Sequence, residues 1–160
     1  MHPILAGATS YGAVAVAQLV GVRNSPTPAN PRTAVWYARL RKPFFTPPGP
    51  VFGLAWTGLD GLLGYAGYRL LVAPASRSRT LALASWSLNL LGIGGFSWVL
   101  FGRKRLDEAT GVSAIMIATS LGSCAASYQV DRRAALAGLP LALWVVFATV
   151  LQEEIWRRNP

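Results

Sequence analysis

Five long apolar runs take up most of the chain, and they constrain its fold more than any other feature. They cover residues 4–22, 50–72, 80–101, 109–128 and 134–151, and short polar or basic stretches separate them. A helix needs about 20 apolar residues to cross the hydrocarbon core of a bilayer. The runs therefore predict an all-α membrane protein, a bundle of five transmembrane helices with its termini on opposite sides of the membrane.

The composition of the chain also favours a membrane protein. Of the 160 residues, 52% are hydrophobic and only 13% are charged, whereas a soluble domain typically has about a quarter charged residues. A chain of this length has room for one domain, so we expect residues 1–160 to form a single transmembrane unit. The alternative is a soluble all-helical protein with a large core.

The basic residues are typical of membrane loops and not of a nucleic-acid-binding surface. The formal charge is +9, but the lysines and arginines fall in short clusters between apolar runs, without a basic helix face or a nucleic-acid motif. Cys124 is the single cysteine and His2 the single histidine, which argues against a disulfide framework, a metal site and a histidine-based triad. We expect no nucleic-acid partner, no metal and no cofactor.

The basic residues are unevenly divided between the two sides of the predicted bundle. The richer side holds the first loop, the third loop and the C-terminus, with Arg23, Arg32, Arg39, Arg41, Lys42, Arg103, Lys104, Arg105, Arg157 and Arg158. The other side holds Arg69, Arg77, Arg79, Arg132 and Arg133. Because cytoplasmic loops carry an excess of lysine and arginine, we predict that the first loop and the C-terminus face the cytoplasm.

Glycines indicate close helix contacts in two of the runs. Gly58, Gly61, Gly64 and Gly67 lie three residues apart in the second run. Such a ridge lets another helix approach closely, in the same chain or across a dimer. The third run has the glycine-rich segment 92–95, where we expect a kink or a close contact.

A proline-rich, aromatic stretch, WYARLRKPFFTPPGPVFGLAW, runs from Trp36 to Trp56. Proline inside a helix removes a donor and clashes with the preceding turn. The segment up to about Gly49 is therefore expected to be an ordered turn that covers the bundle as a lid. A helix should begin near Pro50, because proline is tolerated in the first turn.

This stretch resembles the signature of the translocator protein family, whose members are also called tryptophan-rich sensory proteins or peripheral benzodiazepine receptors. The family pattern is roughly W-Y-x-x-L-x-K-P-x-[FW]-x-P-P-x-x-x-[FI]-x-x-x-W. It is met at Trp36, Tyr37, Leu40, Lys42, Pro43, Phe45, Pro47, Pro48, Phe52 and Trp56. A second similarity lies in the last run, at Pro140, Trp144, Phe147, Ala148, Leu151 and Ile155.

The resemblance implies a five-helix bundle, often a homodimer, with a pocket beneath the first loop that binds porphyrins. Some bacterial members are reported to break down protoporphyrin in light, and the two tryptophans implicated correspond to Trp56 and Trp144. From the motifs and the residues around them, the expected ligand-binding residues are Trp36, Tyr37, Leu40, Phe45, Pro47, Trp56, Asp60, Asn89, Leu141, Trp144, Phe147 and Ala148.

The third apolar run departs from the family pattern, which is usually Q-x-x-x-N-x-x-W. Here Ser85 and Gly92 flank Asn89 in place of the glutamine and the tryptophan. Counting back from Phe101 puts Phe96 in the tryptophan's place, because the chain has about one extra helical turn between Asn89 and the loop. The end of the last run lacks the tyrosine of a proposed cholesterol pattern, itself a weak motif.

Asp60 is an acid within an apolar run, one helical turn from Trp56. Acids inside a membrane are costly and usually face a cavity or a partner. Two interpretations stay open: Asp60 accepts a hydrogen bond from a ligand N–H or an indole, or it is paired within the bundle and has no role in binding. Trp86, Trp98 and Trp156 are interpreted as interface anchors or lipid-facing residues.

Three classes of function follow from these patterns. The leading one is an integral membrane protein that binds porphyrins or similar flat hydrophobic ligands in sensing, sequestration or transport. The second is an enzyme that degrades protoporphyrin oxidatively in light, for which Trp56 and Trp144 would be required. The third is a structural or regulatory membrane partner. The sequence contains no nucleophile–histidine arrangement and no phosphate-binding loop.

Overall fold

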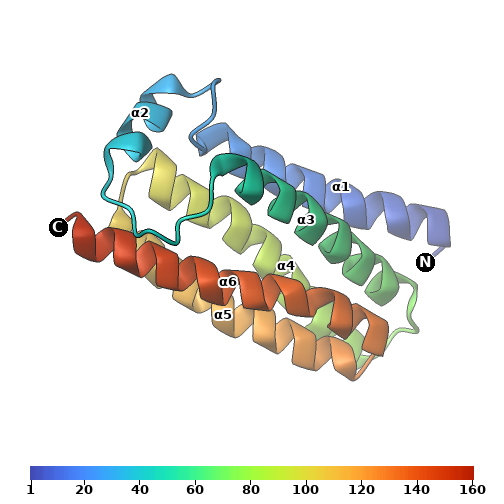
Figure 1. Cartoon of the computed structure of the whole chain (residues 1–160). Helices are drawn as coiled ribbons and strands as arrows, with labels where there is room; N and C mark the ends of the chain where they lie inside the picture. Colours follow the sequence, from blue (N-terminus) through green and yellow to red (C-terminus); the bar gives the residue numbers. More distant parts are fainter.

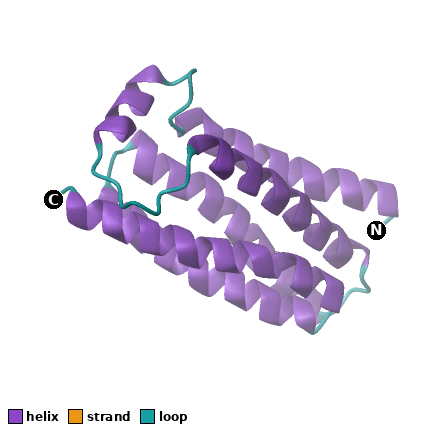
Figure 2. Ribbon diagram, in the orientation of Figure 1, coloured by secondary structure: helices purple, strands orange, loops and turns teal.

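The computed structural model describes all residues, 1–160, and its regular structure is entirely helical (Figure 2). Five long helices run antiparallel to their chain neighbours, a short helix lies at one end of the bundle, and the two termini lie at opposite ends (Figure 1). The elements are α1 Pro3–Asn24, α2 Pro31–Arg39, α3 Gly49–Val72, α4 Arg77–Ser97, the π-helical turn η1 Trp98–Gly102, α5 Leu106–Tyr128 and α6 Arg132–Arg158.

Four helical segments are long and apolar enough to cross a membrane. They are Pro3–Asn24, Arg77–Gly102, Leu106–Tyr128 and Arg132–Arg158. The 24-residue α3 is not among them, because its glycines, its aromatic residues and Asp60 lower its hydropathy. The chain is thus an integral membrane protein by the length and composition of several of its helices.

The helix ends follow from the residues that begin them. Pro31 and Pro50 occupy the first turns of α2 and α3, where an amide donor would be unpaired in any case. Ser76 caps α4, because its Oγ accepts a hydrogen bond from the Arg79 amide at 3.1 Å. Asp131 caps α6 through a 2.8 Å bond from the Arg133 amide to its Oδ1. These caps explain why α4 and α6 begin before the apolar runs they contain.

The five long helices form a closed ring around one apolar core. α1 packs against α3 and α4, α6 packs against α3 and α5, and α4 packs against α5. Val14, Leu63, Ile93, Met116 and Val145 are among the buried core side chains. Many large apolar side chains point outward instead, and Leu91 and Leu143 are each 71% exposed. Such a surface suits a lipid environment better than water.

The inner half of the α3 glycine ridge makes the close contact that its spacing predicted. Gly64 and Gly67 are buried, with the Tyr11 ring over Gly64 and Ser10 beside Gly67. The Ser10 hydroxyl donates a 2.7 Å hydrogen bond to the Gly64 carbonyl. α1 therefore lies directly on this part of α3, as small residues in membrane helices permit. Nothing lies within 4 Å of a Cβ built on Gly58.

The interpretation of Trp86 as an anchor or a lipid-facing residue is wrong. Its side chain belongs to the core, where only 6% of the residue is exposed, and its Nε1 donates to the Leu63 carbonyl at 3.0 Å. The small Gly67 makes room for the indole ring. Trp98 and Trp156 do point outward, with 52% and 42% of their surfaces exposed.

The third apolar run does not break at its glycines. Gly92 faces Met116 of α5, and Gly94 faces Val20 of α1, so close contact is the outcome there. The helix widens only afterwards, in the π-helical turn Trp98–Gly102. Lys104, just beyond this turn, has a φ of 56°, a left-handed conformation that is uncommon for residues other than glycine.

Candidate ligand-binding site

Aromatic rings from α3, α6 and the loop before α3 meet at the end of the bundle that carries α2. The ring centroids of Trp56 and Trp144 are 6.4 Å apart at an interplanar angle of 79°. Phe52 lies 5.5 Å from Trp144, and Phe147 lies 5.4 Å from it. Phe45 of the loop adds a ring 6.5 Å from Phe147. We call these five residues the aromatic cluster; its edge-on and tilted pairs are the arrangements that aromatic quadrupoles prefer.

The indole nitrogen of Trp144 stands out within the aromatic cluster. Its Nε1 is buried and has no hydrogen-bond partner. A buried donor without a partner costs about 1–3 kcal/mol, and native structures contain few such groups. An acceptor atom supplied by a ligand would remove this cost.

An open apolar groove of about 640 Å³ runs along the outside of the α3–α6 contact, next to the aromatic cluster. Ligand sites of small molecules commonly have volumes of about 300–1,000 Å³ and mostly apolar linings. Trp144 and Phe147 belong to both the cluster and the groove. The groove is lined by Pro47, Leu54, Ala55, Gly58, Leu59, Leu62, Pro140, Leu143, Trp144 and Phe147.

The segment before α3 is partly helical, whereas only an ordered turn was expected. Trp36 and Tyr37 lie on the nine-residue α2 and turn toward η1. Tyr37 packs edge-on against Phe101, with their ring centroids 5.5 Å apart. Trp36 packs against the small cluster that contains Val99. Burial raises the pKa of the Tyr37 hydroxyl.

Lys42 holds the end of α2 and does not point freely into solvent. Its Nζ donates to the carbonyls of Ala38 and Leu40, at 3.4 Å and 3.3 Å, and it lies 4.6 Å from the centre of the Tyr37 ring. Burial lowers the pKa of its ammonium group. Arg39, by contrast, is exposed.

The chain terminus fastens the loop that follows α2. Asn159 Oδ1 accepts a hydrogen bond from the Arg41 amide at 2.9 Å, and its Nδ2 donates to the Arg41 carbonyl at 3.0 Å. The same Nδ2 donates to the Ile155 carbonyl at 2.7 Å. One side chain therefore joins the end of α6 to a backbone segment 118 residues away.

Asp60 is paired with α1. Gln18 Nε2 donates to Asp60 Oδ1 at 2.7 Å, and Asp60 does not line the α3–α6 groove. One interpretation expects Asp60 to be paired within the bundle, and Gln18 provides this pairing for one of its two carboxylate oxygens. The amide is a neutral donor, so the carboxyl group lacks a countercharge there.

The structure places ten of the twelve expected site residues in three groups, and Asp60 and Ala148 lie outside them. Phe45, Pro47, Trp56, Trp144 and Phe147 come together at the cluster and the groove. Trp36 and Tyr37 lie on α2 and pack against η1 instead, with Leu40 directly after the helix.

Asn89 and Leu141, each only 2% exposed, lie in the interior at a different place. Ala148 is half-buried on α6. Phe52 was not among the expected site residues, although its position four residues before Trp56 places both on one helix face.

Comparison with known proteins fits this arrangement of motifs. Residues 13–157 match the sequence pattern of the TspO/MBR family. The chain belongs to the TspO/MBR family. Both tryptophans of the aromatic cluster lie within the matched range, which covers nearly the whole bundle.

Individual relatives of the TspO/MBR family cover most of the chain. The tryptophan-rich sensory protein of Cereibacter sphaeroides is 34% identical over 124 residues, which is 78% of this chain and 77% of that protein. Protein CrtK of Rhodobacter capsulatus is 29% identical over 126 residues, with 78% and 79% covered. The human translocator protein is 27% identical over 126 residues, with 78% and 75% covered.

Proposed function

We propose that this protein binds porphyrins or similar flat hydrophobic ligands at the aromatic cluster and acts in their sensing, sequestration or transport. The observation that carries the proposal is the buried, unpartnered Nε1 of Trp144 beside an apolar groove. A conjugated macrocycle offers a large apolar face for the indole and phenyl rings. Its carboxylate or carbonyl oxygens offer the acceptor that the indole N–H lacks.

The proposed setting is a bundle of five spans in which α3 also crosses the membrane and α2 covers the site as a lid. α3 packs within the ring between α1 and α6 and is as long as its neighbours, which supports this count. The exposed Arg39 and Arg41 lie on the lid side, where guanidinium groups can pair with ligand carboxylates or with anionic lipid headgroups.

Asp60 has one of two roles, which an experiment can distinguish. With Gln18 on one oxygen, its other oxygen can accept from a ligand N–H, or the pair can serve only the α1–α3 contact. Replacement by asparagine keeps the shape and removes the charge. If Asp60→Asn leaves porphyrin affinity and its pH dependence unchanged, the acid has no part in binding.

Porphyrin titration in darkness tests the proposal. Full-length protein in lipid nanodiscs is titrated with protoporphyrin, and binding is followed by the porphyrin absorbance. We expect saturable binding near one ligand per chain and a Kd about 5- to 10-fold weaker for Trp144→Phe, because one hydrogen bond is worth about 1 kcal/mol. Trp98→Phe, an exposed tryptophan outside the cluster, should bind like the wild type. Equal affinities of the Trp144 variant and the wild type would contradict the role given to the indole N–H.

Light-dependent degradation of the bound porphyrin is the second candidate function. The 6.4 Å between the Trp56 and Trp144 rings favours it, because two indoles in contact can serve as electron or radical partners of an excited chromophore. Illumination in air should then yield a new absorbing product in the wild type and not in Trp56→Phe or Trp144→Phe. Binding without a product supports the binding function alone, and no binding at all favours a structural or regulatory partner.

A further inference from the structure

A second, interior cavity lies apart from the proposed ligand site. It measures about 10 Å³, the space of one water molecule, and it shares no lining residue with the α3–α6 groove. Its apolar wall includes Leu63, Trp86 and Leu141. Its polar wall is formed by Asn89 of α4 and by Ser120, Ser123, Cys124 and Ser127 of α5.

Two of the cavity serines have hydroxyls that do not bond to the carbonyl of the preceding helical turn. Serine in a helix commonly donates to the carbonyl of the preceding turn, as Ser120 does to Met116 at 2.6 Å. Ser123 and Ser127 form no such bond and no other side-chain hydrogen bond within the protein, although they are only 8% and 3% exposed. Both residues line the cavity, so their hydroxyls are available to a molecule inside it.

Asn89 is incompletely paired in the same place. It is 2% exposed, and its Oδ1 accepts a hydrogen bond from Thr119 Oγ1 at 3.0 Å. Its Nδ2 carries two N–H donors and has no hydrogen-bond partner within the protein. A donor left unpaired in the interior costs about 1–3 kcal/mol, so a molecule that accepts from Nδ2 would be held firmly.

The lining determines what kind of molecule fits. No charged side chain lines the cavity, so an ion would be buried there without a countercharge, at a large cost. The unpaired groups are one amide donor and two hydroxyls, each of which both donates and accepts. A neutral molecule with the size and the hydrogen-bonding capacity of water satisfies all of them.

We propose that this cavity is a binding site for a single water molecule, which accepts from Asn89 Nδ2, bonds to the Ser123 and Ser127 hydroxyls, and so joins α4 to α5. Buried waters typically make about three hydrogen bonds to groups that are otherwise unpaired. The site gives Asn89 a role inside the bundle that is independent of any ligand at the aromatic cluster.

Solid-state NMR of the full chain in lipid bilayers tests the water site. Magnetisation transferred from water protons should reach the Asn89 side-chain amide of the wild type, in spite of its burial. In the double variant Ser123→Ala/Ser127→Ala the transfer should fall at least about threefold, because the water would keep only one of its three proposed partners, whereas buried waters typically make two to four hydrogen bonds. Each single alanine variant should show an intermediate loss.

Ser85→Ala is the matched control, because the Ser85 hydroxyl donates to the Leu81 carbonyl of its own helix at 2.9 Å and does not line the cavity. It should keep the full transfer. Unchanged chemical shifts elsewhere in α4 and α5 show that each variant is folded. Absence of transfer to Asn89 in the wild type overturns the proposal, and so does full transfer in the double variant.

Discussion

Gly67 and Gly58 lie on the same helix, but Gly67 is closely packed and Gly58 is not. A Cβ on Gly67 would meet Ser10 and the Trp86 ring, whereas a Cβ on Gly58 would meet nothing within 4 Å. Overpacking of a close contact costs about 1–3 kcal/mol. We expect Gly67→Ala to lower the melting temperature in detergent clearly, and Gly58→Ala to leave it unchanged or raise it slightly through better helix propensity. Equal melting temperatures would show that α1 does not lie on α3 as described.

Asp131 makes stability depend on pH at the other end of the bundle. Burial would raise the pKa of its carboxyl group, but hydrogen bonds from Arg69 and from the Arg133 and Ala134 amides outweigh burial and hold the pKa below its ordinary value. A group with a lowered folded-state pKa stabilises the fold above its unfolded pKa of about 3.9. That contribution disappears as the pH falls through the lowered value.

We therefore expect the wild type to lose more stability than Asp131→Asn between about pH 5 and about pH 2, as measured by thermal unfolding. At neutral pH the variant should be about 1–2 kcal/mol less stable, through a weaker cap and an unpaired Arg69. Glu153→Gln, which breaks the exposed pair with Arg157, should change stability by less than about 0.5 kcal/mol. Parallel pH profiles of the wild type and Asp131→Asn would contradict the stated role.

At the scale of elements, the hydrogen bonds that attach the loop after α2 to the end of α6 can be tested without any change in the loop itself. Asn159→Ala removes both hydrogen bonds to the Arg41 backbone. We expect hydrogen exchange of the Arg41 amide to become about 10-fold faster, because two bonds of roughly 1 kcal/mol each are lost in part.

Thr149→Ala, also on α6, removes a hydroxyl that bonds only its own helix at Val145, and it should leave exchange at Arg41 unchanged. Mass spectrometry of peptides that span residues 36–48 measures both variants. Unaltered exchange in Asn159→Ala would mean that the rings of Trp36 and Tyr37 suffice to hold the segment.

The sequence predicts the elements well where a local signal begins or ends them. Pro50 marks the start of α3, and the i,i+4 spacing of glutamate and arginine near the C-terminus matches two ion pairs of 3.1 Å, Glu153–Arg157 and Glu154–Arg158. The short α2 was not predicted, because the prolines on either side of it indicated a turn, although Pro31 can begin a helix. The π-helical turn Trp98–Gly102 lies between Asn89 and the loop, but a change of hydrogen-bond register leaves no local sequence signal.

At the scale of the whole molecule, the sequence predicts only part of the candidate site. The two motifs bring Trp56 and Trp144 into contact because both lie at fixed spacings from prolines on adjacent helices. The position of Asn89 depends on the rotation of α4, which the buried Trp86 and the contacts of Gly92 and Gly94 determine. Tertiary packing of this kind is not encoded in spacing along one helix.

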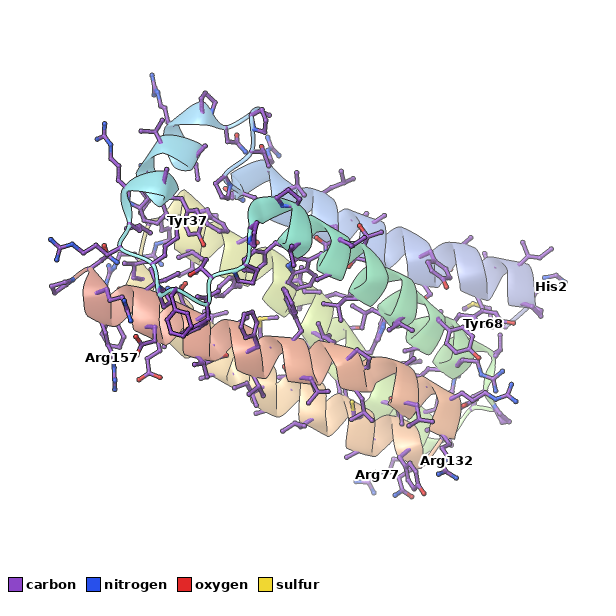
Figure 3. All side chains as sticks on the ribbon, viewed as in Figure 1. His2, Tyr37, Tyr68, Arg77, Arg132 and Arg157 are labelled. Atoms are coloured by element: carbon purple, nitrogen blue, oxygen red, sulfur yellow. The ribbon has the colours of Figure 1, made fainter.

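Orientation in the membrane is a prediction about the whole chain. Arg157 lies at the α2 end of the bundle, and Arg77 and Arg132 lie at the opposite end (Figure 3). With the α2 end in the cytoplasm, a thiol reagent that cannot cross membranes should label Arg77→Cys in intact cells. It should label Lys42→Cys only after lysis, provided that Cys124 is replaced by serine in both variants. The reverse pattern would invert the assigned topology.

Assembly as a homodimer also stays a prediction of the family resemblance. The open space at Gly58 leaves part of the α3 ridge free for a second chain or for lipid. The mass of the purified protein, after subtraction of bound detergent, distinguishes a dimer from a monomer surrounded by lipid, because one chain has a mass of 17.1 kDa.

The contact between Asn159 and Arg41 has a practical consequence for anyone who prepares this protein. A purification tag or fluorescent fusion added after Pro160 begins one residue beyond the side chain that fastens the loop over α6. Such a fusion would lie next to this contact and to the loop that it fastens. A fusion before Met1 extends from the far end of the bundle (Figure 1), so affinity measurements should be made with tags placed there.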